Sequence, residues 1–548
     1  MEPWQFAIAY HDETKHHFRS YARSLGYLDW ATQPNPFRRF VGAPFVSLPF
    51  IDEDCSPPFS DIYELDRVPP QPVCLKTIAE FFYLSLAISA WKEQAGSRWA
   101  LRCNPSSGNL HPTEGYLVIG RVEGLCDAPG VHHYAPREHG LELRTRFSMD
   151  LWKQLVKGFP PGTFLVGLSS ITWREAWKYG ERAYRYCQQD MGHALAACSI
   201  SGATLGWRVC LIARMSDLGV AKVLGLDRRE QFHEGETEDP EALLAVVPSS
   251  SGRPWPVELS AEAIEKIAAG EWQGRPNRLS SPHVEWELID AVAQACMKPA
   301  TVAAGLGTVP VFPEIRRTAP AAAVSARQII RQRRSAVGLD AKTAISKNQF
   351  YAMLSMVLPD FNRVPWSTIG PPVKVHLGLF VHRVTGLEPG LYCLVRSPEH
   401  EDPLRDAMKS GFAWQRPPGC PTLLPLYLLA AGDCTTLAAR VSCHQDIAGD
   451  GAFSLGMIAE FEEPLRRCGA WFYRRLFWEA GAIGQVLYLE AEAAGIRSTG
   501  IGCYFDDPVH DVFGLRGRRY QSMYHFTMGG PLEDSRLTTL PAYGADRL

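Results

Sequence analysis

The chain has 548 residues, of which 46% are hydrophobic and 21% are charged, and its formal net charge is −3. This length exceeds one ordinary hydrophobic core, so we expect two domains. The charge balance lacks a basic stripe and argues against a nucleic-acid partner, and no apolar run approaches the roughly 18 residues of a membrane span. The 14 cysteines are scattered without a CxxC pair, and the N-terminus lacks signal-peptide character. These features predict a cytoplasmic protein without a structural metal site.

The first part of the chain predicts an irregular extension followed by a mixed domain. Residues 1–75 are rich in Pro, Phe and Tyr, whereas residues 76–95 place apolar side chains at helical intervals and predict a helix. Residues 114–125 predict a strand, and residues 131–143 predict a hairpin. A long helix is expected over residues 182–207, with Gly206 as its end signal.

Residues 227 to about 325 hold acidic, Ser/Pro and Ala/Pro stretches, which are typical of a connector with short helices. We therefore divide the chain into an N-terminal extension (1–75), a first domain (76–250), a connector (251–325) and a second domain (326–548).

An internal repeat links the two predicted domains. The segment DMGHALAACSISGATLGWRVCLIARMSDLGVAKVLGL starts at Asp190, and EAGAIGQVLYLEAEAAGIRSTGIGCYFDDPVHDVFGL starts at Glu479. They align without a gap, and the apolar positions correspond, so we interpret the chain as a tandem duplication. Fusion makes the interface of a two-fold dimer intramolecular, and one copy can then lose half of its site. Three glycine pairs recur 289 residues apart: Gly192 with Gly481, Gly206 with Gly495, and Gly225 with Gly514.

Residues 102–116, RCNPSSGNLHPTEGY, gather many small hydrogen-bonding groups. Ser and Gly allow close backbone approach, and Ser and Asn offer donors and acceptors to a flat ligand with polar edges. A plain turn is the alternative interpretation. We expect Glu114 to orient the motif, and we regard His111 and His193 as more structural than catalytic. The candidate binding residues of this motif are Arg102, Pro105, Ser106, Ser107, Gly108 and Asn109.

The long helix with glycine-bounded ends, followed by an extended segment and a second helix closed by Gly-Leu, resembles the FMN-binding nitroreductase fold. PSSGNLHPTEGY resembles the PSxGxxxPxExY signature of SagB-type dehydrogenases, which include the oxidases that convert thiazolines and oxazolines into thiazoles and oxazoles; YHDETKH near the N-terminus resembles the same group. The resemblance implies an α+β protein of two fused nitroreductase-like domains. Each domain would be an antiparallel-rich sheet flanked by helices, and together they would form an intramolecular pseudo-dimer.

The resemblance also implies one FMN at the interface, contacted by both copies. An RRS-type segment for the phosphate and ribityl chain occurs only before the second copy, and STGIGCYFDD resembles the segment whose backbone N–H groups face flavin N5 and O4. In the closing segment MGGPLEDSRLTTLPAY, an arginine returns to the phosphate. Because PSSG occurs only in the first copy, we expect one complete and one degenerate flavin site. The implied residues are Arg333, Arg334, Ser335, Gly500, Ile501, Gly502, Cys503 and Arg536.

Two positions depart from the family pattern. Val337 and Asp534 stand where a basic residue is common, which predicts weaker phosphate binding or compensation by Arg518 or Arg519.

The azoline oxidases carry a Lys–Tyr pair before the long helix, and the resemblance assigns this pair to Lys178 and Tyr179 as catalytic residues. The aligned second-copy residues are Arg467 and Cys468. A desolvated lysine can act as a base while hydride passes to flavin, and a tyrosine can relay the proton. A lysine stem packed beside a buried tyrosine is the structural alternative.

We therefore expect an FMN-dependent two-electron oxidation of an azoline-type heterocycle or a related small or peptidic substrate, with electrons discharged to oxygen or another acceptor. One alternative is an NAD(P)H-dependent reductase of nitro, quinone or enone compounds. Another is a non-catalytic scaffold in a peptide-modifying complex. Because the family dimer is fused, the chain can act as a monomer.

Overall fold

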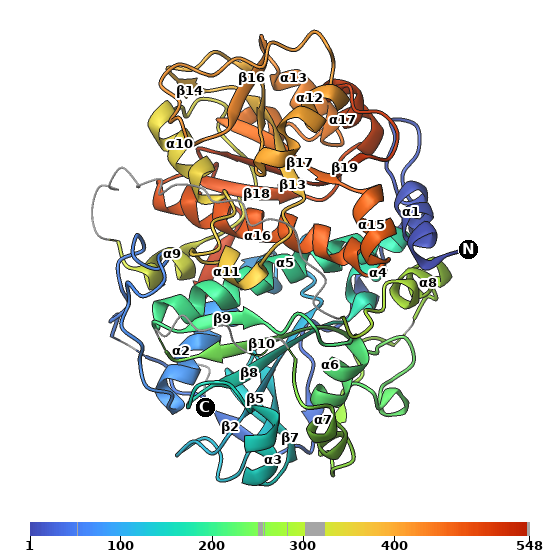
Figure 1. Cartoon of the computed structure of the whole chain (residues 1–548), viewed down its shortest axis with the longest axis vertical. Coiled ribbons are helices and arrows are strands. Elements are labelled where there is room, and N and C mark those ends of the chain that lie inside the picture. The colour runs from blue at the N-terminus through green and yellow to red at the C-terminus, as the bar shows by residue number, and fades with distance from the viewer. Residues whose placement is uncertain (52, 250–255, 257, 282, 302–323, 545–548) are drawn as a thin grey trace.

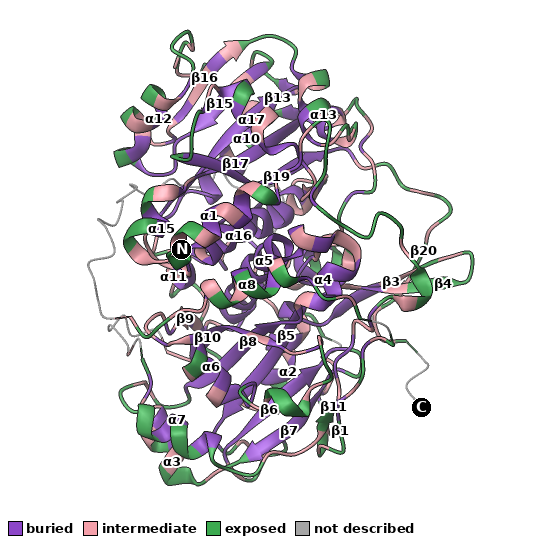
Figure 2. Cartoon of the chain, turned by 90° about the vertical axis from the view of Figure 1, so that its right-hand side faces the viewer, coloured by how far each residue is buried: buried purple, intermediate pink, exposed green. Residues whose placement is uncertain are grey.

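Two antiparallel sheets lie at opposite ends of the molecule, with two long helices side by side between them (Figure 1). The computed structural model describes residues 1–51, 53–249, 256, 258–281, 283–301 and 324–544. The central helices are α5 (Ala183–Thr204) and α16 (Phe472–Ala493), each 22 residues long. Every residue of α5 is buried, so this helix has no solvent face and belongs to the core of the whole chain (Figure 2).

The first sheet lies below the central helices in Figure 1. Its strand order is β2-β7-β6-β5-β8-β10-β9, and every named pairing within it is antiparallel. Its strands are β2 (Phe45–Ser47), β5 (Thr113–Ile119), β6 (Gly130–Ala135), β7 (Gly140–Arg146), β8 (Phe164–Ser170), β9 (Arg208–Leu211) and β10 (Asp239–Val247).

The second sheet lies above the central helices and has the order β16-β15-β13-β17-β19-β18. Apart from the edge strand β2, this order matches the first sheet strand for strand, so the two halves share one topology. Its strands are β13 (Val375–Val381), β15 (Gly390–Leu394), β16 (Leu426–Ala431), β17 (Phe453–Glu460), β18 (Arg497–Ile501) and β19 (Tyr520–Gly529).

The helices repeat with the spacing of the sequence repeat. The bounds of α5 and α16 differ by 289 residues, and so do those of α6 (Asp217–Leu224) and α17 (Asp506–Phe513). Helix α6 ends at Gly225 with φ 74°, and α17 ends at Gly514 with φ 79°; both glycines adopt the left-handed conformation that closes a helix. The α+β architecture of two fused, similar halves is confirmed.

Terminal segments of the chain tie the halves together. Helix α1 (Pro3–Glu13) packs on α8 (Glu287–Ala295) and on α15 (Glu462–Cys468). The C-terminal strand β20 (Thr538–Pro541) pairs with β3 (Ile88–Gln94), which pairs with β4 (Ser97–Arg102), in a small sheet on one side of the molecule (Figure 2). The last strand of the second half therefore forms its ladder with a strand of the first half.

The remaining helices and short strands flank the sheets or connect them. None of the described helices is long and apolar enough to cross a membrane. They are α3 (Met149–Leu155), α4 (Thr172–Tyr179), α7 (Ala261–Ala268), α9 (Ala326–Gln332), α10 (Lys347–Met356), α11 (Trp366–Ile369), α12 (Glu401–Ala407), α13 (Thr435–Val441) and α14 (Ile447–Asp450), with strands β1 (Phe40–Val41), β11 (Arg275–Pro276), β12 (Ile345–Ser346) and β14 (Val384–Thr385).

The expected long helix and hairpin are confirmed as α5 and as β6 with β7. The helix expected over residues 76–95 is wrong in its second half, because α2 (Leu75–Ser85) gives way to β3 (Ile88–Gln94). The reason is tertiary: β3 finds ladder partners in both β4 (Ser97–Arg102) and β20. Much of the expected connector, including residues 251–255 and 302–323, lies outside the described residues.

Candidate functional site

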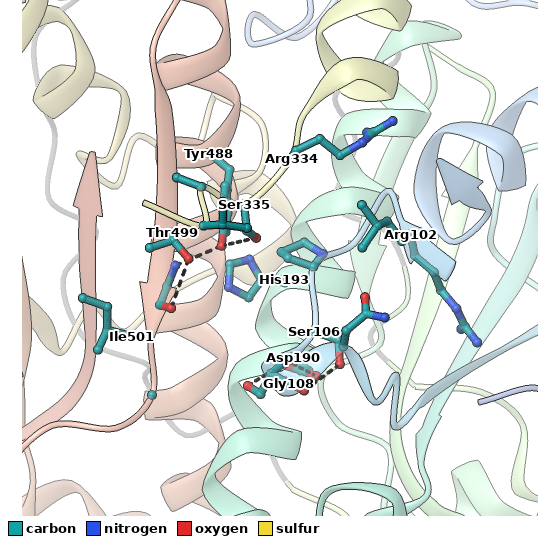
Figure 3. A pocket seen from close by; sticks show the side chains of 18 of the residues that line it. Arg102, Ser106, Gly108, Asp190, His193, Arg334, Ser335, Tyr488, Thr499 and Ile501 are labelled. Atoms are coloured by element: carbon teal, nitrogen blue, oxygen red, sulfur yellow. Dashed lines mark hydrogen bonds between the residues drawn. The ribbon is translucent and has the colours of Figure 1, made fainter. Parts of the chain in front are cut away.

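A cavity of about 370 Å³ opens where the two halves meet, and residues from both halves line it. Its walls are the loop after β4, the N-terminal part of α5, the segment after α9, and strand β18. Figure 3 shows Ser106 and Gly108 on one side, Thr499 and Ile501 on the facing strand, and His193 between them. The predicted residues that line it are Arg102, Pro105, Ser106, Ser107, Gly108, Asn109, Tyr179, Arg333, Arg334, Ser335, Gly500, Ile501, Gly502 and Cys503.

The loop from the first half is held by a carboxylate of α5. Asp190 accepts from the backbone N–H and from Oγ of Ser107, each at 3.0 Å. Gly108 has φ 56°, and a Cβ there would lie 2.5 Å from the hydroxyl oxygen of Tyr179. A glycine is needed because the turn is left-handed and the tyrosine ring packs directly on it. Asn109 Nδ2 then donates to Ala100 O at 2.7 Å and anchors the loop to β4.

A buried ionic network supports the end of this loop. Arg174 donates to His111 O at 2.7 Å and pairs with Glu114, which lies 3.0 Å from His133. Burial alone would raise the pKa of Glu114, but Arg174 and His133 lower it below its usual value. Burial opposes the charge on His133, but its hydrogen bonds with Glu114 and Glu142 raise its pKa to about 9. Glu114 therefore stays ionised and orients the loop, as the sequence predicts.

The second half contributes the basic segment after α9. Arg333 is buried, and its Nη2 donates to Arg102 O at 2.9 Å. Within the described part of the chain, Nε and Nη1 of Arg333 have no hydrogen-bond partner. Ser335 joins β18 through a bridge to Ser498, and its hydroxyl lies 2.8 Å from that of Tyr488. This segment therefore presents a buried cation with unpaired donors to the cavity.

Strand β18 forms the facing wall. The backbone N–H of Gly500 donates to Tyr488 Oη at 2.9 Å, so this N–H already has a partner. Gly502 and Cys503 follow the end of the strand, and a Cβ on Gly502 would collide with the ring of Tyr186. The ring of His193 lies nearby. It is neutral, because burial lowers its pKa to about 3.

Two predicted arginines are oriented differently from the expectation. Arg102 lines the cavity with part of its chain, but its guanidinium turns away and donates to Pro36 O and Thr113 O (Figure 3). Arg536 is not among the lining residues; its side chain is 75% exposed and pairs with Asp534 at 2.8 Å. Asp534 itself lines the cavity, so only the partner of Arg536 reaches it.

Sequence reasoning missed several lining residues. Asp190 and His193 stand at the start of the repeat. Asp190 aligns with Glu479, and a carboxylate at both aligned positions is the signal that could have identified Asp190. Glu479 accepts from the backbone N–H of Lys374 at 2.9 Å, so the two carboxylates hold equivalent segments. Further lining residues are isolated and carry no local pattern; among them are Lys92, Tyr186, Tyr488, Arg497 and Tyr524.

Comparison with known proteins identifies the fold. A crystal structure of a putative nitroreductase from Anabaena variabilis covers 96% of this chain and 99% of its own, with a TM-score of 0.68 and 21% identity. The chain has the nitroreductase fold. A putative nitroreductase from Methanocaldococcus jannaschii is 23% identical over 126 residues, which are 22% of this chain and 62% of that relative, so the match spans less than two thirds of the curated relative. No protein-family model matches the chain.

A crystal structure of a putative nitroreductase from Ralstonia eutropha covers 41% of this chain and 96% of its own, with 14% identity and a TM-score of 0.27.

In this nitroreductase fold, the Lys178–Tyr179 pair ends α4 beside the cavity. Tyr179 lines the cavity, and burial raises its pKa well above the usual value, so its hydroxyl remains protonated. Lys178 does not line the cavity; its Nζ lies 5.3 Å from the centre of the Tyr179 ring and 6.0 Å from that of Trp30. Burial lowers the pKa of Lys178, with Glu175 opposing the shift.

The equivalent position in the other half of the nitroreductase fold is filled by the chain itself. Helix α11 packs against β9 and α5. Thr368 donates to Val209 O at 2.7 Å and lies 2.6 Å from the hydroxyl of Ser199, the counterpart of Tyr488. Arg475, the counterpart of Tyr186, donates to Ile369 O at 2.8 Å. The segment that aligns with the PSSG loop therefore occupies the space that remains open in the first site.

Proposed function

We propose that the chain is an FMN-dependent oxidoreductase that arose by tandem duplication and carries one flavin site. The observation that carries the proposal is the composition of the cavity. The PSSG loop occurs only in the first half, the RRS segment occurs only in the second half, and both line the same cavity of about 370 Å³. This volume falls within the range of small-molecule sites.

The residues present fit the chemistry of a flavin mononucleotide. The unpaired Nε and Nη1 of the buried Arg333 suit a phosphate or ribityl oxygen, with Arg334 beside it. Arg497 and Lys92 add positive charge, although Arg497 also pairs with Glu533 at 2.6 Å. A phosphate would therefore compete with Glu533 for Arg497.

The other end of the cavity suits the flavin ring. The donors of Ser107 and the amide nitrogen of Asn109 are engaged within the protein, but the oxygens of these side chains and of Ser106 can still accept hydrogen bonds from the edge of the ring, and Tyr186 and Tyr524 supply flat side chains. Asp190 holds the loop in place; burial raises its pKa to about 7, although the Ser107 hydrogen bonds oppose that shift.

Bound FMN would supply the two-electron chemistry, and we propose that the Lys178–Tyr179 pair manages the accompanying proton. Tyr179 reaches the cavity with a protonated hydroxyl, and Lys178 lies behind it with a lowered pKa. The relay requires the side chain of Lys178 to turn until Nζ reaches the hydroxyl of Tyr179, which then takes a proton from the substrate as it passes its own proton to Lys178. The pair would thus act as a base relay rather than through direct contact of Lys178 with the substrate.

This proton relay favours a SagB-type dehydrogenation of an azoline-type heterocycle or a related small or peptidic substrate, with oxygen or another acceptor taking the electrons in the cytoplasm. An NAD(P)H-dependent reductase of nitro, quinone or enone compounds is the second candidate, and the putative nitroreductases among the similar proteins favour it.

Anaerobic mixing of the FMN-loaded protein separates the two candidates. A thiazoline- or oxazoline-containing peptide should bleach the flavin absorbance of a dehydrogenase, whereas NADPH and NADH should leave it unchanged. Fast bleaching by a nicotinamide and none by azolines would establish the reductase instead. A chain that binds no FMN would favour the third possibility, a scaffold in a peptide-modifying complex.

A further inference from the structure

Two cysteines meet in the wall of the cavity. Sγ of Cys443 and Sγ of Cys503 lie 2.7 Å apart, although the residues are 60 positions apart in the chain. Cys503 follows β18 and lines the cavity, whereas Cys443 lies in the turn between α13 and α14. Both side chains are half-buried, so small oxidants and reductants can reach them.

A left-handed turn holds the Cys443 thiol next to that of Cys503. Cys443 has φ 53° and His444 has φ 57°, two consecutive left-handed residues that are not glycine. This conformation is unfavourable for residues other than glycine and is retained where the surroundings impose it. Gln445 Nε2 fixes the turn because it donates to Ser442 O and to Cys503 O, each at 2.9 Å.

We propose that Cys443 and Cys503 are a redox-active pair that forms a disulfide in the cavity wall. A disulfide bond of about 2.05 Å requires the sulfurs to approach by less than about 1 Å. With hydrogen peroxide as oxidant, the O–O bond breaks, the S–S bond forms, and the two thiol protons leave in two water molecules. An added dithiol reverses the step by exchange and becomes oxidised itself.

The surroundings favour the thiolate that such chemistry needs. Contact with the Cys443 thiol lowers the pKa of Cys503 and outweighs the effect of burial, and the positive charge of Arg182 acts in the same direction as that contact, although Asp506 opposes it. Arg182 is held there by its ion pair with Asp506 at 2.9 Å. A thiolate next to a fixed guanidinium and a second thiol is the arrangement that resolves oxidation to a disulfide rather than to higher oxides.

The pair belongs to the open site alone. The counterpart of Cys503 in the first half is Arg214, 289 residues earlier, beside the position that α11 fills. All 14 cysteines lie within the described residues, and no other two of their sulfurs make a hydrogen-bond contact there. The inference does not depend on flavin binding, because it concerns only the chain's own sulfurs.

Thiol counting tests the proposal on the full-length protein, with and without added FMN. The reduced protein is treated with increasing hydrogen peroxide, denatured, alkylated and analysed by mass spectrometry. We expect loss of two of the 14 thiols before any other, a crosslinked peptide pair containing positions 443 and 503, and full recovery with dithiothreitol. Cys443→Ser and Cys503→Ser should each abolish the crosslink. Cys420→Ser, another half-buried cysteine, should leave it intact.

Either of two outcomes would overturn the proposal. One is an unchanged count of 14 thiols at peroxide concentrations that fully oxidise a small reference dithiol. The other is a first crosslink that joins different cysteines. Because the wild-type count alone distinguishes these results, a variant that fails to fold does not remove the test.

Discussion

Gly192 of α5 faces Gly481 of α16 where the two long helices pack together. A Cβ on either glycine would lie 2.8 Å from the Cα of the other, which is closer than real side chains approach. Gly481 follows Gly192 by 289 residues, the spacing of the repeat. Equivalent residues that touch each other lie on the axis of a two-fold interface, so this contact locates the pseudo-two-fold axis between the halves.

Two ion pairs repeat the same symmetry on either side of this axis. Arg185 pairs with Asp506 at 2.8 Å, and Arg474 pairs with Asp217 at 2.7 Å. The arginines are 289 residues apart, and so are the aspartates. Each half therefore presents an arginine to the aspartate of the other, as the two subunits of a symmetric dimer do.

The glycine contact predicts that bulk at position 192 destabilises the whole chain. Gly192→Leu should lower the free energy of unfolding by at least about 1–3 kcal/mol, because the helices cannot separate without disturbing both halves. Urea denaturation followed by far-UV circular dichroism measures the change. Gly219→Ala in α6 is the matched control, since the neighbouring Met215 side chain can move, and it should be neutral or stabilising. Equal stability of Gly192→Leu and wild type would contradict a close contact between the two helices at Gly192.

The ion pairs predict acid sensitivity. Burial alone would raise the pKa of Asp506, but Arg182 and Arg185 hold it well below its usual value of 3.8. Because the folded-state pKa is the lower one, the stabilisation is complete above about pH 3.8 and is lost as the pH falls toward the folded-state pKa.

Asp506→Asn should therefore destabilise the protein at pH 7 by about 3–5 kcal/mol and flatten the acid limb of its stability profile. Denaturation at a series of pH values checks both effects. Asp150→Asn removes a carboxylate that is 96% exposed and should reproduce the wild-type profile. A steep acid limb that survives in Asp506→Asn would assign the sensitivity to other carboxylates.

Sequence patterns were enough to predict the long helix α5 and the mixed fold. The glycines at 206, 225, 495 and 514 are local signals, because each adopts the left-handed conformation that follows a helix or its last turn. The bounds of α5 and α16 follow the repeat for the same reason.

Several contacts between distant segments could not be read from the sequence. Tyr488 and Tyr524 reach the cavity from within apolar stretches that look like ordinary core. Cys443 meets Cys503 only because a left-handed turn brings them together. The sequence pattern of β3 favours a helix, but the segment is a strand because it pairs with β20 from the other end of the chain. Each of these features depends on packing between distant segments rather than on local spacing.

Arg333 provides a direct test of the proposed phosphate position. Arg333→Ala should weaken FMN binding about 10- to 100-fold, the effect of losing a hydrogen bond to a charged group. Fluorescence titration of free FMN measures the change, and circular dichroism should report an unchanged fold. Arg536→Ala is the matched control, because the side chain of Arg536 is exposed and does not line the cavity. Equal losses in both variants would contradict the placement of the phosphate at Arg333.

The proposed proton relay predicts a loss of rate without a loss of flavin. Lys178→Ala and Tyr179→Phe should retain bound FMN and slow flavin reduction by an azoline-containing peptide about 10²- to 10⁴-fold. Anaerobic stopped-flow absorbance measures this half-reaction. Arg467→Ala, at the counterpart of Lys178, should reduce the flavin at the wild-type rate. Wild-type reduction by Lys178→Ala would remove that residue from the mechanism.

The stoichiometry of flavin tests the split site most directly. The purified protein is saturated with FMN, freed of excess by gel filtration and denatured, and the released flavin is counted against protein concentration. One open cavity and one position filled by α11 predict one FMN per chain. Two FMN per chain would mean that α11 moves out of the second position to admit a flavin. No bound FMN would contradict the proposed flavin site altogether.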